Sequence, residues 1–355
     1  MIAALDDLDG IARLDSLNIL ETVEGFADQC RRGWQLGISA AALPDPGGIE
    51  SVVVLGMGGS GVSGDVVRAV VEPRLPFPFR VEKGYGPLPS WVGRSSLVVA
   101  VSYSGDTEET LAAASDALER GARLVTIATG GGLAAMAEEH GLSHVAVPPG
   151  LQPRSALGLL TLPLLAVLDR MELVPPFQED VEEASDVLDE LGARCHRKIS
   201  TPDNPAKSVA QRLVNTIPLV YGGRGVGSTA AYRFKCDLNE YAKTPAFWNE
   251  LPELNHNEIE SWDATEMTKD FALVLLRDPS EHPSISRRFE ISRELIGGRA
   301  ENAVEVMAEG KSPLAHLLSL LFVTQLAAIY LAIARGVDPG PVEVLQRLKQ
   351  KLAES

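Results

Sequence analysis

The stretch Ser-Val-Val-Val-Leu-Gly-Met-Gly-Gly-Ser-Gly at residues 51–61 joins a run of β-branched residues directly to a glycine-rich loop. Residues 62–71 continue with a helical pattern. β-Branched runs favour strands, and glycines let the backbone turn sharply into a helix. The stretch therefore predicts a strand–loop–helix unit, with the loop at the carboxyl end of the strand.

The alternation of strand and helix patterns continues beyond this unit. Further strands are expected at residues 79–82, 97–101, 124–128 and 144–147, and helices at residues 107–120 and 133–140. Strands that alternate with helices form a parallel sheet with helices on both faces. The sequence thus predicts an α/β fold with a doubly wound sheet, in which ligands bind where strands end and helices begin.

A second round of the same pattern begins at residues 217–221, which run into the glycine-rich loop 222–228. Strands are expected at residues 271–276 and 302–307, with a helix at residues 285–296 between them. The two halves look like one architecture used twice in tandem.

An acidic segment separates the two halves and is expected to form a connecting helix followed by a polar linker. We therefore place N-terminal helices and a first domain in residues 1–174. The acidic helical linker occupies residues 175–207, and a second domain with C-terminal helices occupies residues 208–355.

The composition limits the classes of partner. The chain has 355 residues, of which 45% are hydrophobic, and 48 acidic against 32 basic side chains give a net charge of −16. Such a chain can bury a sizeable core, so disorder is not expected. An acidic surface repels nucleic acid and anionic membranes, so we expect neither as a partner. An anionic small molecule would need a local pocket of positive potential.

The cysteines and the chain start predict a cytoplasmic protein. Cys30, Cys195 and Cys236 form no CxxC pair and no even set, which excludes a disulfide framework and a thiolate metal site. The six histidines are scattered, and no metal site is expected. The first residues have no basic and apolar signal pattern. Residues 317–334 are apolar enough to raise the question of a membrane span, but a helix buried in the core is the better explanation.

The glycine loop by itself allows two ligands. Gly56 to Gly61 fits the G-x-G-x-x-G dinucleotide pattern, and Glu82 lies 21 residues beyond Gly61, where an acid that binds ribose is expected. This would suggest an NAD-dependent oxidoreductase. The same loop could instead hold a phosphomonoester, because close backbone amides, the Ser60 hydroxyl and a helix N-terminus all favour an anion.

The next strand end favours the phosphomonoester. Ser102, Ser104 and Thr107 bring three hydroxyls to a second junction of strand and helix, which suits a cradle for one phosphate. A simpler interpretation is that Ser104 or Asp106 merely caps the helix that starts near Thr107.

The two loops together carry a resemblance to a known domain. Gly58-Gly59-Ser60-Gly61 and Ser102-Tyr103-Ser104-Gly105-Asp106-Thr107-Glu108-Glu109-Thr110 resemble a sugar isomerase (SIS) domain. The resemblance implies a flavodoxin-like parallel sheet that binds phosphosugars. Fold-level similarity alone leaves an isomerase, an amidotransferase and a sugar-sensing regulator open.

Two segments of the second half add candidate residues. Residues 232–243 are dense in charge, and a solvated helix face is the plain interpretation. In residues 251–259, His256 stands between two asparagines after a Pro-Glu turn, a context that favours a loop over a core position.

Glu240 and His256, together with Pro153-Arg154-Ser155-Ala156, resemble the bifunctional phosphoglucose/phosphomannose isomerase family over nearly the whole chain. The resemblance implies two SIS domains in each subunit and a homodimer with the active site at the subunit interface. It assigns Glu240 as the catalytic base and Arg154 to electrostatic stabilisation. It assigns ring opening to Lys349 and to His256 from the neighbouring subunit.

The same resemblance implies that Gly59, Ser60, Ser102, Ser104 and Thr107 bind the sugar phosphate. The function it implies is a metal-independent, cofactor-free isomerase that interconverts glucose 6-phosphate, mannose 6-phosphate and fructose 6-phosphate through a cis-enediol. The alternative is a non-catalytic SIS-domain regulator that binds phosphosugars.

Three positions depart from the family pattern: Asp106 and Tyr241 replace asparagines, and Gly340 replaces a threonine. The preference between the glucose and mannose phosphates is therefore left open.

Overall fold

The computed structural model describes residues 5–263, 268–297 and 303–354. The chain divides into two compact units, each built from separate segments. The sheet A unit comprises Gly25–Asp189 and Gly310–Leu318, and the sheet B unit comprises Met1–Glu24, Glu190–Glu309 and Ser319–Ser355. The domain boundaries that the sequence analysis placed after residues 174 and 207 stay predictions.

The sheet A unit holds five parallel strands in the order β2-β1-β3-β4-β5. The strands are β1 (Ser51–Leu55), β2 (Phe79–Glu82), β3 (Ser96–Val101), β4 (Arg123–Ala128) and β5 (Ser143–Ala146). This is the flavodoxin-like strand order. The predicted strands are confirmed, each to within a residue at either end. The β-branched runs of β1, β3 and β4 are buried on both faces of the sheet, whereas β2 and β5 are partly exposed.

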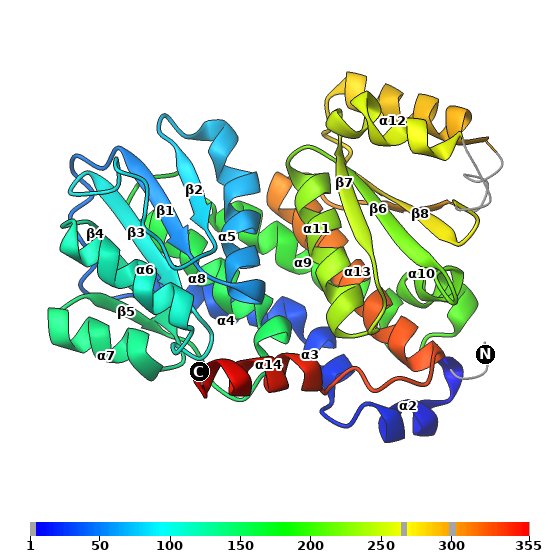
Figure 1. The fold of residues 1–355 in the computed structure, drawn as a ribbon, viewed down its shortest axis with the longest axis horizontal. Coiled ribbons are helices and arrows are strands. Elements are labelled where there is room, and N and C mark those ends of the chain that lie inside the picture. The colour runs from blue at the N-terminus through cyan, green and yellow to red at the C-terminus, as the bar shows by residue number, and fades with distance from the viewer. Residues whose placement is uncertain (1–4, 264–267, 298–302, 355) are drawn as a thin grey trace. The chain divides into compact units, whose positions relative to one another are not determined.

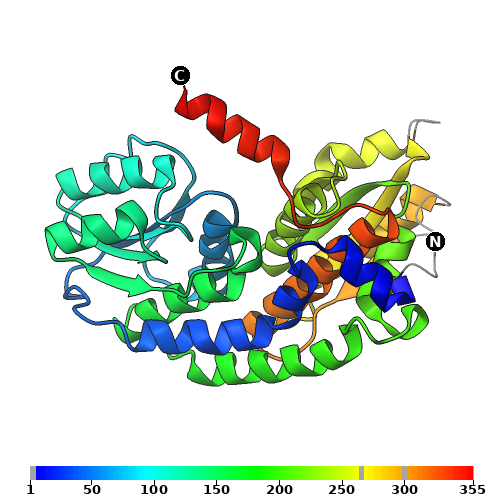
Figure 2. The ribbon, with the colours of Figure 1, turned by 90° about the horizontal axis from the view of Figure 1, so that it is seen from below.

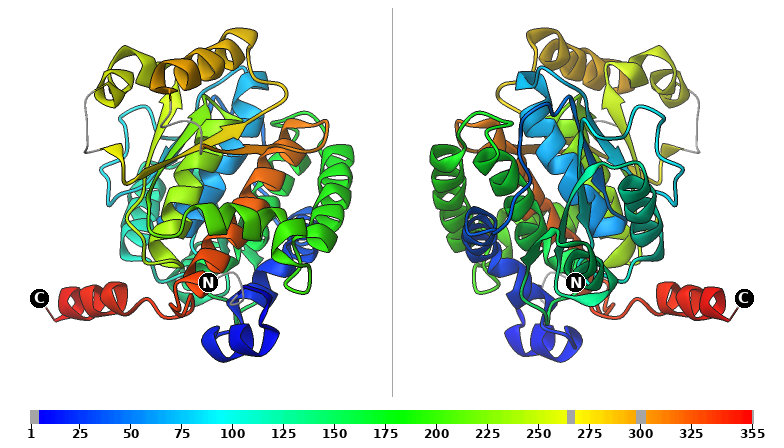
Figure 3. Two further views of the ribbon diagram at one scale, coloured as in Figure 1. Left: turned by 90° about the vertical axis from the view of Figure 1, so that its right-hand side faces the viewer. Right: turned by 90° about the vertical axis from the view of Figure 1, so that its left-hand side faces the viewer.

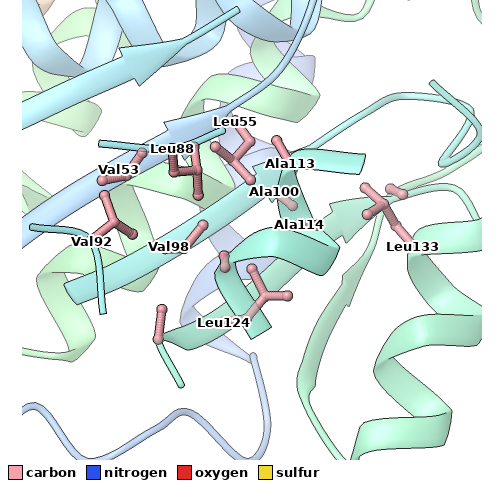
Figure 4. Close-up of a cluster of buried hydrophobic side chains, with 13 residues drawn as sticks. Val53, Leu55, Leu88, Val92, Val98, Ala100, Ala113, Ala114, Leu124 and Leu133 are labelled. Atoms are coloured by element: carbon pink, nitrogen blue, oxygen red, sulfur yellow. The ribbon is translucent and has the colours of Figure 1, made fainter. Parts of the chain in front are cut away.

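Helices cover both faces of sheet A (Figure 1). They are α4 (Phe26–Ile38), α5 (Gly58–Val71), α6 (Glu108–Glu119), α7 (Gly131–His140) and α8 (Leu157–Arg170), with short 3₁₀ turns η1 (Glu72–Arg74) and η2 (Pro153–Ser155). On one face, Val53, Val98 and Leu124 of the sheet pack with Ala113 and Ala114 of α6 (Figure 4). Helices α5 and α8 contact one another, and Gly64 of α5 lies against Val54 on the opposite face.

The acidic helix predicted between the two halves is present as α9 (Gln178–Cys195). It lies alongside α4 (Figure 2), where the Trp34 Nε1 donates to Gln178 Oε1 at 2.6 Å and Arg31 pairs with Asp189. Its charged residues face solvent, while its apolar stripe belongs to the core.

The sheet B unit repeats the strand order of sheet A with one strand fewer, β7-β6-β8-β9. Its parallel strands are β6 (Ile217–Gly223), β7 (Phe247–Leu251), β8 (Phe271–Arg277) and β9 (Val304–Met307). The expectation of one architecture used twice is confirmed. Residue 302, where the last strand was expected to start, lies outside the described residues.

Strand β7 was not predicted, because Phe247-Trp248-Asn249-Glu250 lacks β-branched residues. It is an edge strand whose first residues are exposed, so burial did not select an apolar pattern there.

The described helices of the sheet B unit include α2 (Leu8–Leu14), α3 (Ile19–Glu24), α10 (Pro205–Arg212), α11 (Val226–Glu240), α12 (Pro283–Ile296) and α14 (Glu343–Ala353), with turns η3 (Thr201–Asp203), η4 (Glu253–His256) and η5 (Glu258–Trp262). Helix α13 (Pro313–Ala334) is shared, since its residues up to Leu318 belong to the sheet A unit and those from Ser319 to the sheet B unit. Helices α11, in yellow-green, and α12, in gold, cover opposite faces of sheet B (Figure 3). Phe289 of α12 packs with Tyr221 and Leu275 of the sheet.

Helix α13 is long and apolar enough to cross a membrane by length and composition. Its apolar window is nevertheless entirely buried inside the protein. The prediction of a buried core helix at this place is confirmed.

Candidate functional site

The two predicted phosphate loops lie next to one another at the carboxyl edge of sheet A. Strands β1 and β3 are neighbours, and their register pairs Leu55 with Ala100, so both strands end at the same level. Helix α5 begins at Gly58 and α6 begins at Glu108, immediately after the two loops. Amides in the first turn of a helix have no partner within that helix, so this edge presents donors suited to an anion.

Hydroxyls join the two loops. The Ser60 Oγ accepts a hydrogen bond from the Tyr103 backbone N–H at 3.2 Å. The Ser102 and Thr107 hydroxyls are 2.8 Å apart, and Ser102 Oγ also accepts from the Gly105 N–H at 3.1 Å. Ser102 is fully buried, whereas Ser104 is exposed and Thr107 is partly exposed. The five predicted phosphate residues therefore lie together, with Ser104 and Thr107 the most open of the hydroxyls.

Position 105 requires glycine because the loop that contains Gly130 approaches it closely. The φ of Gly105 is +81°, and a Cβ atom at this position would lie 1.9 Å from the carbonyl oxygen of Gly130. Only glycine fits both conditions without moving the backbone. The residue thereby packs the Ser102–Thr107 loop against the start of α7.

The interpretation of Ser104 or Asp106 as a mere cap of α6 is wrong. The N-cap residue of α6 is Thr107. The Ser104 hydroxyl accepts from the Asp106 N–H at 3.2 Å, and Asp106 Oδ1 accepts from the Gly132 N–H at 2.8 Å. The Asp106 carboxylate thus satisfies the N-terminus of α7, a stabilising place for a negative charge.

Glu82, the acid expected to bind ribose in a dinucleotide site, is paired within its own strand. Its Oε2 accepts from Arg80 Nε at 2.9 Å. A ribose hydroxyl would have to compete with this guanidinium for the carboxylate.

Arg154 belongs to the same unit as the phosphate loops. It lies in η2, which packs against α5, and its side chain is buried. One terminal nitrogen is 3.5 Å from Gln152 Oε1. A guanidinium is always charged in proteins, so Arg154 provides a fixed positive potential.

Glu240 is the last residue of α11 and opens into a cleft of the sheet B unit. The cleft has a volume of about 530 Å³ and is lined by Asn239, Glu240, Lys243, Asp338, Pro341, Val342, Glu343, Val344 and Leu345. The Lys243 Nζ donates to the backbone carbonyl of Glu240 at 2.6 Å, which holds the end of the helix. Glu240 is partly exposed there, so its carboxylate is accessible from solvent.

The interpretation of residues 232–243 as a solvated helix face is wrong. Arg233 and Asp237 are almost fully buried and form a two-point ion pair, with Nε to Oδ2 at 3.0 Å and NH2 to Oδ1 at 2.8 Å. Burial alone lowers the pKa of Arg233, but the Asp237 charge outweighs it and raises that pKa above its ordinary value. Arg233 and Asp237 of α11 are therefore part of the core, whereas Lys235 and Glu240 are partly exposed.

His256 and Lys349 are both exposed. His256 ends η4, which follows β7 at the carboxyl edge of sheet B. Lys349 lies on α14, one turn beyond Leu345 of the Glu240 cleft. The alternative of a core histidine at position 256 is thereby wrong.

Two departures from the family pattern have physical consequences in the sheet B unit. Tyr241 is buried and its hydroxyl accepts from Gln325 Nε2 at 3.0 Å, which ties the end of α11 to α13. A Cβ atom at Gly340 would lie 2.8 Å from Leu17 Cγ, so Leu17 fills the space that a larger residue would need.

Tyr103 and Lys243 were not predicted as site residues from the sequence. Tyr103 lies inside the Ser102–Thr107 motif. Lys243 follows the last residue of α11, Glu240, by three residues and lies outside the helix.

Known proteins resemble this chain over almost its full length. Residues 49–149 match the model of the SIS domain, and residues 202–352 match that of the bacterial phospho-glucose isomerase C-terminal SIS domain. The bifunctional phosphoglucose/phosphomannose isomerase of Caldicellulosiruptor bescii is 35% identical over 337 residues, which cover 95% of this chain and 99% of the relative. The enzyme of the same name from Aquifex aeolicus is 32% identical over 335 residues, 94% of this chain and 98% of the relative.

The fold has a counterpart among solved structures. A hypothetical protein from Thermus thermophilus superposes with a TM-score of 0.70 at 18% identity, covering 98% of this chain and 94% of the other. The prediction of two tandem SIS domains is confirmed. With relatives above 30% identity along almost their whole length, the chain is an isomerase that belongs to the bifunctional phosphoglucose/phosphomannose isomerase family.

Proposed function

We propose that this isomerase interconverts glucose 6-phosphate, mannose 6-phosphate and fructose 6-phosphate in the cytoplasm, without a metal ion or cofactor. The observation that carries the proposal is the position of Glu240, a carboxylate at the mouth of a cleft of about 530 Å³ in a chain of this family.

The reaction needs one base. An aldose becomes a ketose when the proton on C2 is removed and a proton is returned to C1, through a cis-enediol. A single carboxylate can do both, and we assign this role to Glu240. The negative charge that develops on the enediolate oxygens is stabilised by a fixed cation, the role of Arg154.

The phosphate is assigned to the two loops at the carboxyl edge of sheet A. Gly59 and Ser60 contribute amides of the first turn of α5. Ser104 and Thr107 offer accessible hydroxyls, while buried Ser102 orients Thr107 through their 2.8 Å contact. Together these groups bind one phosphate dianion by hydrogen bonds and helix dipoles.

His256 and Lys349 are assigned to opening the sugar ring. The geometry of one chain supports a homodimer in which His256 comes from a second copy. Helix α11 starts at the carboxyl edge of sheet B and runs for 15 residues, about 22 Å, to Glu240. His256 stays at the edge where α11 starts, because η4 directly follows β7. An imidazole of the same chain cannot span the length of that helix.

The proposal is tested by incubating the purified protein, treated with a chelator, with fructose 6-phosphate and following both aldose phosphates over time. We expect both products. One product alone would restrict the specificity, and loss of activity on chelation would refute metal independence. If neither forms while fructose 6-phosphate still raises the melting temperature, the protein is a phosphosugar-binding regulator.

His256→Ala is expected to slow ring opening. Turnover of fructose 6-phosphate should fall by about 10²-fold, the scale of one lost acid–base group. The 5-deoxy analogue of fructose 6-phosphate has no O5 with which to close a ring, and its turnover should change by less than about threefold. Initial rates on both substrates measure this, with His140→Ala as the exposed-histidine control. Equal losses on the two substrates would remove the ring-opening role.

A mixing experiment separates the two subunits' contributions. Glu240→Gln and His256→Ala should each, alone, have turnover of fructose 6-phosphate reduced by about 10²-fold or more. Refolding the two variants together should recover activity, because a mixed dimer contains one site with both native groups. Absence of recovery in a mixture shown to exchange subunits would place His256 in its own chain's site.

Ser104→Ala combined with Thr107→Val is expected to raise KM for fructose 6-phosphate. Each hydrogen bond to a charged group contributes about 1.5–3 kcal/mol, so KM should rise at least tenfold while kcat changes less. Ser90→Ala, an exposed loop serine of the same unit, serves as the control. An unchanged KM would mean that the phosphate binds elsewhere.

A further inference from the structure

Arg154 is preceded by a tight turn at Pro148-Pro149-Gly150-Leu151. Proline at the second position and glycine with a φ of +105° at the third are typical of a type II turn. Such a turn normally closes with a hydrogen bond from the fourth residue's N–H to the first residue's carbonyl. Arg154 follows the last residue of the turn by three positions.

The Tyr103 hydroxyl bridges the two groups that this bond would join. It donates to the Pro148 carbonyl oxygen at 2.9 Å and accepts from the Leu151 N–H at 2.9 Å. A hydroxyl has one proton to donate and lone pairs to accept, so both functions are used by the turn. The hydroxyl thereby holds the turn at a fixed width.

Tyr103 is itself anchored in the phosphate loops. Its N–H donates to Ser60 Oγ at 3.2 Å, and its carbonyl accepts from the Thr129 N–H at 2.9 Å. Its ring is buried, and burial raises the pKa of the hydroxyl, which therefore keeps its proton near neutral pH. One residue thus links the loop that we assign to phosphate binding with the turn that leads to Arg154.

We propose that Tyr103 is a positioning residue, whose hydroxyl sets the place of Arg154 relative to the phosphate loops. The inference rests on the proposed function of Arg154. Without the hydroxyl, the Pro148 carbonyl and the Leu151 N–H can bond directly to one another. The turn then narrows, and the chain that carries Arg154 shifts away from the position that stabilises the enediolate.

Tyr103→Phe in the full-length protein tests the proposal. We expect kcat for fructose 6-phosphate to fall about 10- to 100-fold, since a displacement of about 1 Å at a reacting centre has effects of that size. KM should stay within about twofold, because the backbone contacts of Tyr103 to the phosphate loops remain. Tyr330→Phe is the matched control, since its buried hydroxyl also donates to a backbone carbonyl, that of Cys195, at 2.9 Å. The control should lose a similar amount of thermal stability and keep kcat.

A double variant separates positioning from general loss of structure. Arg154→Lys should lower kcat, and adding Tyr103→Phe should lower it little further, because Tyr103 acts through Arg154. Additive losses, an equal rise in KM, or an unchanged kcat in Tyr103→Phe would overturn the inference. Unchanged kcat in Arg154→Lys would instead remove the role of Arg154 in the proposed function.

Discussion

Glu240→Gln is expected to lower kcat for fructose 6-phosphate by about 10²–10⁴-fold, the contribution of a general base. Glutamine has nearly the shape of glutamate but cannot accept a proton at neutral pH. KM should stay within about threefold, since the phosphate loops lie in other segments of the chain and their binding energy is retained. Steady-state formation of both aldose phosphates measures the loss.

A second readout ties the loss to proton transfer. Glucose 6-phosphate deuterated at C2 should lose its label to solvent with the native enzyme and retain it with Glu240→Gln. Glu343→Gln is the matched control, because Glu343 lines the same cleft and has no assigned role in the reaction. Near-normal turnover of Glu240→Gln, or an equal effect of Glu343→Gln, would refute Glu240 as the base.

The sequence predicted the elements whose patterns reflect burial. The runs at residues 52–55 and 97–101 are strands because each is covered on both faces, and this leaves a continuous β-branched signal. The edge strand β7 was missed for the opposite reason, since its first residues face solvent and carry no such signal. The β-branched pattern of a strand therefore reflects how far the strand is buried, and edge strands are the least buried strands of a sheet.

The site was predicted less completely than the fold, because a one-dimensional pattern does not show what a polar group is bonded to. Ser102 was expected to contact the phosphate, and Asp106 was considered as a cap of the helix that starts near Thr107. In the fold, Ser102 is buried against Thr107, and Asp106 holds the start of α7 through Gly132. Ser102 and Thr107 are five residues apart in one loop, whereas Asp106 and Gly132 are 26 apart, and the sequence pattern shows neither contact.

The charged residues of α11 are a second case in which the sequence pattern does not show what a polar group contacts. Arg233 and Asp237 are four residues apart, a spacing typical of exposed ion pairs on a helix surface. Their burial depends on packing against the rest of the sheet B unit, which the spacing does not reveal. Removal of one partner lowers the free energy of unfolding much more for a buried ion pair than for an exposed one.

Asp237→Asn is expected to destabilise the protein by about 3–5 kcal/mol, because it leaves the Arg233 guanidinium buried without its counter-ion. Urea unfolding followed by circular dichroism measures the shift. Glu309→Gln is the control, since Glu309 forms an exposed pair with Arg194 and should lose no more than about 1 kcal/mol. Equal effects of the two variants would mean that the buried pair contributes no more than a surface contact.

The double variant Arg233→Met with Asp237→Leu distinguishes loss of charge balance from loss of the pair itself. Replacing a buried pair by apolar residues of similar volume is often neutral, so much of the stability should return. Glu240 follows Asp237 by less than one helical turn, and its position depends on the same helix. If stability returns together with turnover, the pair serves to bury the end of α11 in a fixed place. If stability returns without turnover, the charges of Arg233 and Asp237 act on the Glu240 carboxylate itself.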